Sequence, residues 1–122
     1  MVQFELLSDR GILAITPDGP LERADFERLA AAIDPYIAAN GKLTGIMITA
    51  ETFPGWISFE AMTAHFNFVA SHHQKIERIA VVTNHALLKM APHFGGLLVQ
   101  PKIRAFDASE TDKALAWLET GQ

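Results

Sequence analysis

The sequence has no cysteine and a small net charge, and each of these features excludes a class of function. The absence of cysteine excludes disulfide cross-links, thiolate metal sites and a cysteine nucleophile together. Ten basic residues stand against fourteen acidic ones, which gives a net charge of −4. The basic surface that nucleic-acid binding requires is therefore missing, and we expect no nucleic-acid partner.

Long apolar runs are also missing. No stretch approaches the roughly 20 residues that a membrane-spanning helix needs. The first residues, with Glu5 inside their apolar pattern, lack the basic start and apolar middle of a signal peptide. We therefore expect a cytoplasmic protein without integral membrane association. With 49% hydrophobic and 20% charged residues, the 122-residue chain fits a single globular domain over residues 1–122.

The start of the chain predicts a β-hairpin. Val2, Phe4 and Leu6 alternate with polar residues, which is the period of a half-buried strand. A short turn at residues 9–11 leads into an apolar strand over residues 12–15, so an antiparallel pair is expected. A helix follows, because residues 26, 29, 30, 33 and 37 form one apolar stripe. Pro35 falls inside this helix and predicts a kink or a break there.

From residue 43 onward, strands and helices alternate. Strands are expected over residues 43–50, 79–83 and 102–106, and helices over residues 58–73, 86–94 and 109–119. The first two of these strands are apolar on both faces, which is typical of a parallel sheet covered by helices. The sequence predicts an α/β fold of order ββαβαβαβα. Its mixed, mainly parallel five-stranded sheet carries four helices, with the hairpin strand at one edge.

This pattern, together with several short motifs, resembles a known family. The motifs are Gly55-Trp56 and the segments at residues 77–82, 103–107 and 114–118. They resemble the STAS fold of bacterial anti-sigma-factor antagonists and, more narrowly, the SpoIIAA-like proteins. The resemblance implies a non-catalytic binding or regulatory module that acts through protein–protein interaction. It also places Ser58 at the phosphoacceptor position of the antagonists' Asp-Ser-Ser-Gly motif.

The rest of that motif is absent, because Ile57, Phe59 and Glu60 replace its other members. Regulation of a sigma factor is therefore not carried over. A second role explains Ser58 equally well: its hydroxyl is a good N-cap for the following helix. Phosphate at that helix start is the alternative, because free backbone N–H groups favour it.

The loop before Ser58 is the first candidate binding site. Phe53 and Trp56 lie in it, and it follows a predicted parallel strand, at the edge of the sheet where ligands bind. Asn84 and His85 are expected at the same edge. The two aromatic residues either cap the core or form an apolar cleft. Such a cleft would bind a lipid-like or aromatic molecule, or a partner protein.

The helix after this loop is the second candidate. We assign its stripe of residues 59, 62, 66 and 69 to the core. Phe68 then lies on the opposite side, together with His65, His72 and two alanines. A face of small and aromatic residues packs a partner, such as a second copy of the chain. The alternative is that a neighbouring helix covers Phe68 within the monomer.

Catalytic and metal-binding motifs are not found. The five histidines lack the His-Glu-x-x-His spacing of a zinc site. Ser58 lacks the flanking glycines of a hydrolase elbow, and no glycine-rich loop opens a helix. We expect no enzyme, no metal and no cofactor. The main hypothesis is a protein-binding module, and the alternative is a carrier of a lipid-like ligand, since the fold also resembles lipid-transfer domains of the Sec-fourteen type.

Overall fold

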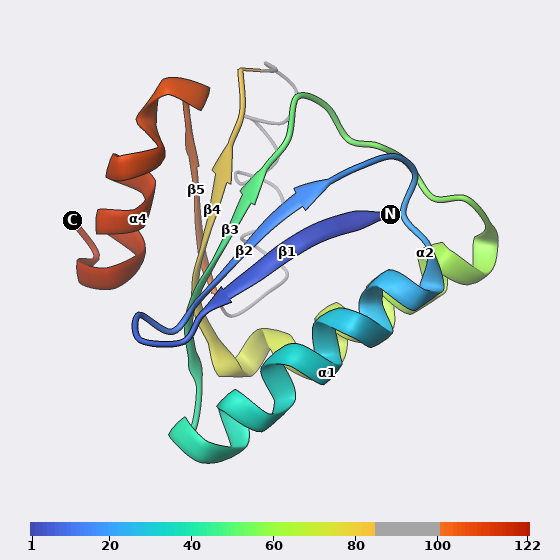
Figure 1. The fold of residues 1–122 in the computed structure, drawn as a ribbon, viewed down its shortest axis with the longest axis horizontal. Helices are drawn as coiled ribbons and strands as arrows, with labels where there is room; N and C mark the ends of the chain where they lie inside the picture. Colours follow the sequence, from blue (N-terminus) through green and yellow to red (C-terminus); the bar gives the residue numbers. More distant parts are fainter. Residues whose placement is uncertain (85–100) are drawn as a thin grey trace.

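The computed structural model describes residues 1–84 and 101–122 and contains a five-stranded mixed sheet (Figure 1). The strands are β1 (Val2–Leu7), β2 (Ile12–Pro17), β3 (Leu43–Thr49), β4 (Ile76–Val82) and β5 (Lys102–Phe106). They are arranged in the order β1-β2-β3-β4-β5, with β1 antiparallel to β2 and every other pair parallel. The predicted mixed sheet, its hairpin and the edge position of the hairpin strand are confirmed.

Helix α1 (Arg23–Asn40) runs through Pro35 as one element, so the predicted break is wrong. Its buried face, which includes Phe26, Leu29 and Ile33, lies against the sheet. Pro35 lies on the exposed side. Water can therefore solvate the backbone carbonyl that proline leaves without a partner, while packing of the buried face holds the helix together.

Asp25 joins the start of α1 to the start of the sheet. Its buried carboxylate accepts the backbone N–H of Glu22 at 2.8 Å and of Val2 at 3.1 Å, and Arg28 lies 2.8 Å from it. Burial alone raises the pKa of Asp25, but the hydrogen bonds from Glu22, Arg28, the N-terminal amino group and Val2 outweigh it and hold that pKa below its ordinary value. The ionised carboxylate therefore fixes the position of Val2 beside α1.

Helices cover both faces of the sheet. Helix α2 (Phe59–His72) lies beside α1 on one face, and α4 (Thr111–Thr120) covers the other (Figure 1). The short 3-10 turns η1 (His73–Lys75) and η2 (Ala108–Glu110) follow α2 and precede α4. The described residues thus contain three α-helices and not the four predicted, because the helix expected over residues 86–94 lies outside them.

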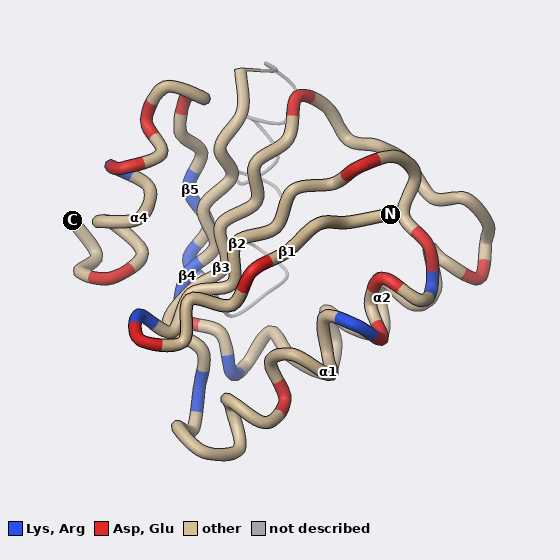
Figure 2. The backbone as a smooth tube through the Cα atoms, viewed as in Figure 1, with Lys and Arg blue, Asp and Glu red and all other residues tan. Residues whose placement is uncertain are grey.

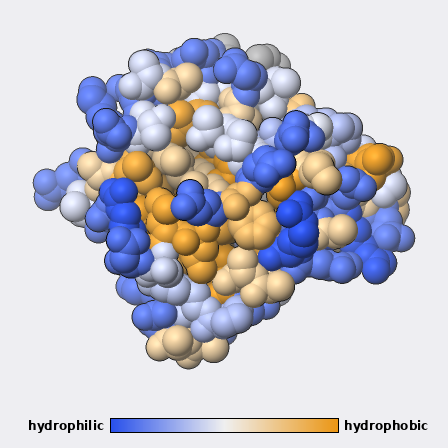
Figure 3. Space-filling view, viewed as in Figure 1, coloured by the Kyte–Doolittle hydropathy of each residue, from blue (hydrophilic) through white to orange (hydrophobic). Residues whose placement is uncertain are grey.

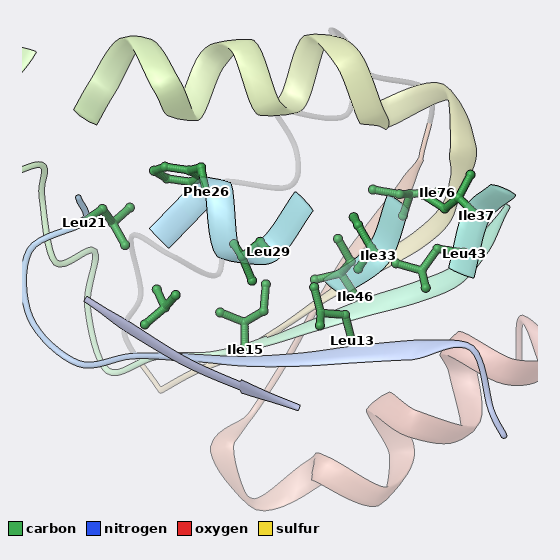
Figure 4. Close-up of a cluster of buried hydrophobic side chains, with 11 residues drawn as sticks. Leu13, Ile15, Leu21, Phe26, Leu29, Ile33, Ile37, Leu43, Ile46 and Ile76 are labelled. Atoms are coloured by element: carbon green, nitrogen blue, oxygen red, sulfur yellow. The ribbon is translucent and has the colours of Figure 1, made fainter. Parts of the chain in front are cut away.

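Two buried clusters fill the two faces. The larger cluster lies between the sheet and α1, where Leu13 and Ile46 meet Leu29 and Ile33 (Figure 4). The smaller one lies beneath α4 and contains, among others, Ile12, Met47, Ala80, Phe106, Trp117 and Leu118. Along β2, Leu13 and Ile15 belong to the larger cluster, whereas Ile12 and Ala14 pack in the smaller one, as the two-residue period of a strand requires.

The charged residues lie outside these two hydrophobic clusters. They are spread over the loops, the helices and the strands, such as the acidic residue on β1 and the basic residues on β5 (Figure 2). Helix α2 is poor in them, because Glu60 is its only Asp, Glu, Lys or Arg residue. In the part of the chain that the structure describes, no helix combines the length and the apolar character needed to cross a membrane.

Candidate functional site: an apolar cavity beneath helix α2

A cavity of about 250 Å³ lies between the sheet and the helices α1 and α2. Strands β2, β3 and β4 supply its floor, and α1, α2 and the loop after β3 supply its walls. The lining is almost wholly apolar and includes Val2, Ile15, Leu21, Phe26, Leu29, Ile46, Ile48, Phe53, Phe68, Val69, Ile76, Ile79 and Val81. Thr52, His65, His72 and His73 are its polar members. Phe53 and Thr52 are exposed, so the loop forms the rim.

The volume sets the size of a molecule that would fit. Pockets for drug-sized ligands span roughly 300–1,000 Å³. An apolar cavity of ~150 Å³ is large enough for benzene. At about 250 Å³, this cavity has room for a molecule somewhat larger than benzene. Its walls offer such a molecule mainly dispersion contacts and the removal of apolar surface from water.

The loop over residues 50–58 is held against the start of α1 by backbone hydrogen bonds. The Leu21 N–H donates to the Gly55 carbonyl at 2.8 Å, and the Ile57 N–H donates to the Leu21 carbonyl at 2.9 Å. Gly55 has a φ of 78°, a conformation that side chains with a Cβ rarely adopt. These contacts fix Trp56, the residue between Gly55 and Ile57, beside α2.

Trp56 is the centre of an aromatic group at the rim. Its indole Nε1 donates to Nδ1 of His65 at 3.1 Å. Its ring lies edge-on to Phe53 at 5.0 Å and to Phe66 at 5.8 Å between ring centroids. Edge-to-face pairs of this kind stabilise aromatic clusters beyond their burial. The predicted candidates Phe53 and Trp56 therefore lie together, and Phe53 borders the cavity.

His65 is half-buried and connects this aromatic group to α1. Its ring stacks on Phe26, with 4.8 Å between ring centroids and 18° between ring planes. Burial lowers the pKa of His65, because water is not available to solvate the charged ring. The neutral imidazole is thus favoured at this position.

His72 lies about two turns further along the same side of α2 and has a different environment. It is 9% exposed and stacks on Phe68 at 4.3 Å. Its Nε2 lies 2.7 Å from the Asp34 carboxylate, and its Nδ1 lies 2.8 Å from the Phe68 carbonyl. His72 and Asp34 therefore tie the end of α2 to the middle of α1.

The orientation of α2 corrects the predicted one. Phe59 and Phe66, assigned to the core, are 78% and 56% exposed, whereas Ala61 is fully buried. Phe68 lies inward, 6.0 Å from Phe26 of α1, so the alternative that a neighbouring helix covers it is confirmed. The small alanines let α2 approach the rest of the fold closely, and Trp56 holds His65 on the inner side.

Two other predicted site residues, Ser58 and Asn84, are not part of the cavity lining. Ser58 is the N-cap of α2, where its Oγ accepts the Ala61 N–H at 3.1 Å, so the capping role is confirmed. Phosphorylation of Ser58 stays a prediction. Asn84 follows β4, and its side-chain oxygen accepts the N–H of Ala108 at 3.1 Å. His85 lies outside the described residues.

Large apolar side chains are also exposed elsewhere in the part of the chain that the structure describes. Ile57, Phe59 and Phe66 are more than half exposed on the loop and the outer side of α2, and we call these three residues the outer patch. A second area gathers over the β1 side of the sheet, between α1 and α4 (Figure 3). In residues 1–84 and 101–122, no three His, Cys, Asp or Glu residues come together in a way that could hold a metal ion.

Sequence reasoning did not identify Phe26 or Asp34 as part of this region. Phe26 was assigned to the core, which is correct, but its stacking on His65 depends on how two helices meet. Asp34 lies on the polar side of α1, and nothing in its local sequence indicates a partner 38 residues away.

Comparisons with known proteins agree with this architecture. The family model described as SpoIIAA-like matches residues 12–119. An uncharacterized protein with a SpoIIAA-like fold from Shewanella loihica PV-4 superposes with a TM-score of 0.74 at 20% sequence identity, covering 97% of this chain and 92% of that one. At that identity the likeness shows a shared fold. No curated protein matches the sequence.

Proposed function

The chain belongs to the SpoIIAA-like family, and we propose that it is a non-catalytic module that binds a small hydrophobic molecule in the cavity beneath α2. The observation that carries this proposal is the apolar lining of a space of about 250 Å³ inside the larger buried cluster. Such a lining selects for apolar surface on the ligand, with few polar groups to orient it.

The energetic cost of the cavity supports the same conclusion. Protein interiors are packed as densely as organic crystals and contain few voids larger than a water molecule. The side chains that line a space of about 250 Å³ lack packing partners on that side and so lose dispersion contacts. A ligand that fills the space supplies contacts with these walls.

The test is a titration of the 13C-methyl-labelled protein with propylbenzene, followed by NMR. We expect the methyl signals of Ile48, Ile79 and Val81 to shift with a saturating dependence, because these residues line the cavity. The variant Val69→Phe should abolish the shifts by filling the space. Ala70→Phe is the matched control, because Ala70 is exposed on the same helix and its substitution leaves the cavity open.

Absence of any shift in the wild-type protein up to the solubility limit of propylbenzene would refute the proposal. Shifts that survive Val69→Phe unchanged would place the binding elsewhere and refute it as well.

A second candidate function is self-association through the outer patch. Phe59, Ile57 and Phe66 are 78%, 62% and 56% exposed, and Phe59 and Phe66 share one side of α2 because they are seven residues apart. Exposed large apolar side chains that share one surface are typical of interaction sites. Sedimentation velocity over a range of concentrations tests this directly. A dimer that the double substitution Phe59→Ser with Phe66→Ser converts to monomer supports it, and a wild-type monomer at all concentrations excludes it.

A further inference from the structure

His65 is the polar residue of the cavity whose hydrogen bonding is determined by its neighbour. An indole N–H donates and does not accept, so Trp56 requires a lone pair on Nδ1 of His65. An imidazole with a lone pair on Nδ1 is neutral and carries its proton on Nε2. The Trp56 contact therefore makes His65 a hydrogen-bond donor at Nε2.

This donor has no acceptor within the described part of the chain. The hydrogen bond of His65 is the one at Nδ1, and its ring otherwise makes aromatic contacts with Phe26, Trp56 and Phe66. The Nε2–H bond points away from the Nδ1 side of the ring and therefore away from Trp56. His65 is among the residues that line the cavity, so a ligand oxygen there can accept this N–H.

Among the described residues, the other polar groups around the cavity carry no permanent positive charge. His72 already contacts the Asp34 carboxylate through Nε2 and the Phe68 carbonyl through Nδ1. Among the described residues that line the cavity there is no Lys or Arg. Burial lowers the pKa of His65, which agrees with the neutral ring that the geometry requires.

Resting on the proposed function, we infer that the ligand is an uncharged amphiphile, such as a ketone or an ester, whose oxygen accepts the Nε2–H of His65. Its apolar body would then lie along Phe26, Phe68 and the strand residues of the floor. A carboxylate is disfavoured, because it would lose hydration without meeting a cation.

Three probes of similar size separate the possibilities: propiophenone with a carbonyl, propylbenzene with no acceptor, and phenylacetate with a carboxylate. Dissociation constants come from NMR titrations of the full chain. For the wild-type protein we expect propiophenone to bind roughly two- to tenfold more tightly than propylbenzene, as one net hydrogen bond allows. Phenylacetate should bind more weakly than both.

The variant His65→Phe keeps a ring to stack on Phe26 and removes the donor. It should lose the preference for propiophenone, so that the ratio of the dissociation constants of propylbenzene and propiophenone falls to about one. A second readout needs no variant: the imidazole 15N spectrum of the wild-type protein should show the Nε2–H tautomer of His65, and propiophenone should shift that signal more than propylbenzene does.

The outcomes distinguish this inference from the proposed function. Equal affinity for the ketone and the hydrocarbon, or tightest binding of the carboxylate, would overturn the inference and leave hydrophobic-ligand binding intact. The Nδ1–H tautomer in the 15N spectrum would overturn it as well. Failure of all three probes to bind would overturn both proposals.

Discussion

The two faces of the sheet are packed differently. Beneath α4, Leu118 is fully buried and lies so close to Gly45 that a Cβ on this glycine would come within 2.7 Å of it. Beneath α1 and α2, the same sheet borders a cavity of about 250 Å³. The chain packs closely on the α4 face of the sheet. The cavity is therefore a feature of the face covered by α1 and α2 and not of the whole sheet.

The contrast also separates residues that stabilise the fold from residues that are available for binding. The α4 face uses Phe106, Trp117 and Leu118 wholly for packing. The other face combines a buried cluster with the half-buried rings of Trp56, His65 and Phe68, which have surface left for a ligand. Four predictions test this difference, in order of decreasing effect on stability.

Shortening a buried side chain should lower the free energy of unfolding most on the α4 face of the sheet. Leu118→Ala should lower the free energy of unfolding by ~2–5 kcal/mol, the range for a fully buried leucine. Ile79→Ala should cost less, because Ile79 is half-buried and already borders empty space. Urea unfolding of both variants measures the difference. An equal or larger loss for Ile79→Ala would contradict the contrast.

Adding one carbon atom to the α4 face should also be destabilising. Gly45→Ala brings its Cβ within 3.2 Å of the Arg78 carbonyl, in addition to the Leu118 contact. Overpacking of this kind costs ~1–3 kcal/mol. In the double variant with Leu118→Ala the loss should be smaller than the sum of the two single losses, because the clash is relieved. Strict additivity in urea unfolding would argue against a shared contact.

Adding one carbon atom to the cavity face should have the opposite sign. Val69 borders the cavity, so Val69→Leu should raise the free energy of unfolding by ~0.5–2 kcal/mol, as cavity-filling changes commonly do. Thermal unfolding without ligand measures it. A loss of stability similar to that of Gly45→Ala would show that the two faces do not differ in available space.

The smallest effect concerns pH. Because burial lowers the pKa of His65, the unfolded chain takes up a proton there at a higher pH than the folded one. The stability that neutral His65 contributes is therefore fully present above the ordinary histidine pKa of ~6.5. It is lost as the pH falls from that value through the pKa of His65 in the folded protein. In urea unfolding at several pH values, His65→Gln should show a shallower decline over this range. Identical slopes for the wild-type protein and His65→Gln would contradict a lowered pKa of His65 in the folded protein.

The pH dependence from Asp25 lies at lower values. Its pKa is held below the ordinary value of ~3.9, so the stability it provides is present above that value and lost as the pH falls through the folded pKa. The pH range in which Asp25 loses its contribution lies below the range in which His65 does. The slope of the unfolding free energy against pH near pH 6 can therefore be assigned to histidine.

The sheet could be predicted from the sequence because each strand carries its own pattern. The alternation of Val2, Phe4 and Leu6 and the apolar run of β3 are local signals. The order of the strands in the sheet could not be predicted from them, apart from the hairpin strand at one edge, because the order depends on contacts between elements. Local patterns did not determine the orientation of α2, because both of its sides carry aromatic residues. Its inner side depends on the Trp56–His65 hydrogen bond and on the stacking of Phe26, which arise only when the loop and α1 meet it.

The candidate site was therefore predictable in part. Phe53, Trp56 and Phe68 could be predicted because they are large apolar residues that the expected strands and core-facing helix stripes do not use. The cavity that Phe53 and Phe68 border is a property of packing between elements and has no signature in the sequence.

The measurement that tests the central claim most directly is a set of intermolecular nuclear Overhauser effects between bound propylbenzene and the protein. Binding beneath α2 predicts contacts from the ligand protons to the methyl groups of Ile48, Ile79 and Val81. Contacts confined to Phe59 and Phe66 on the outer patch, or to residues beneath α4, would contradict it.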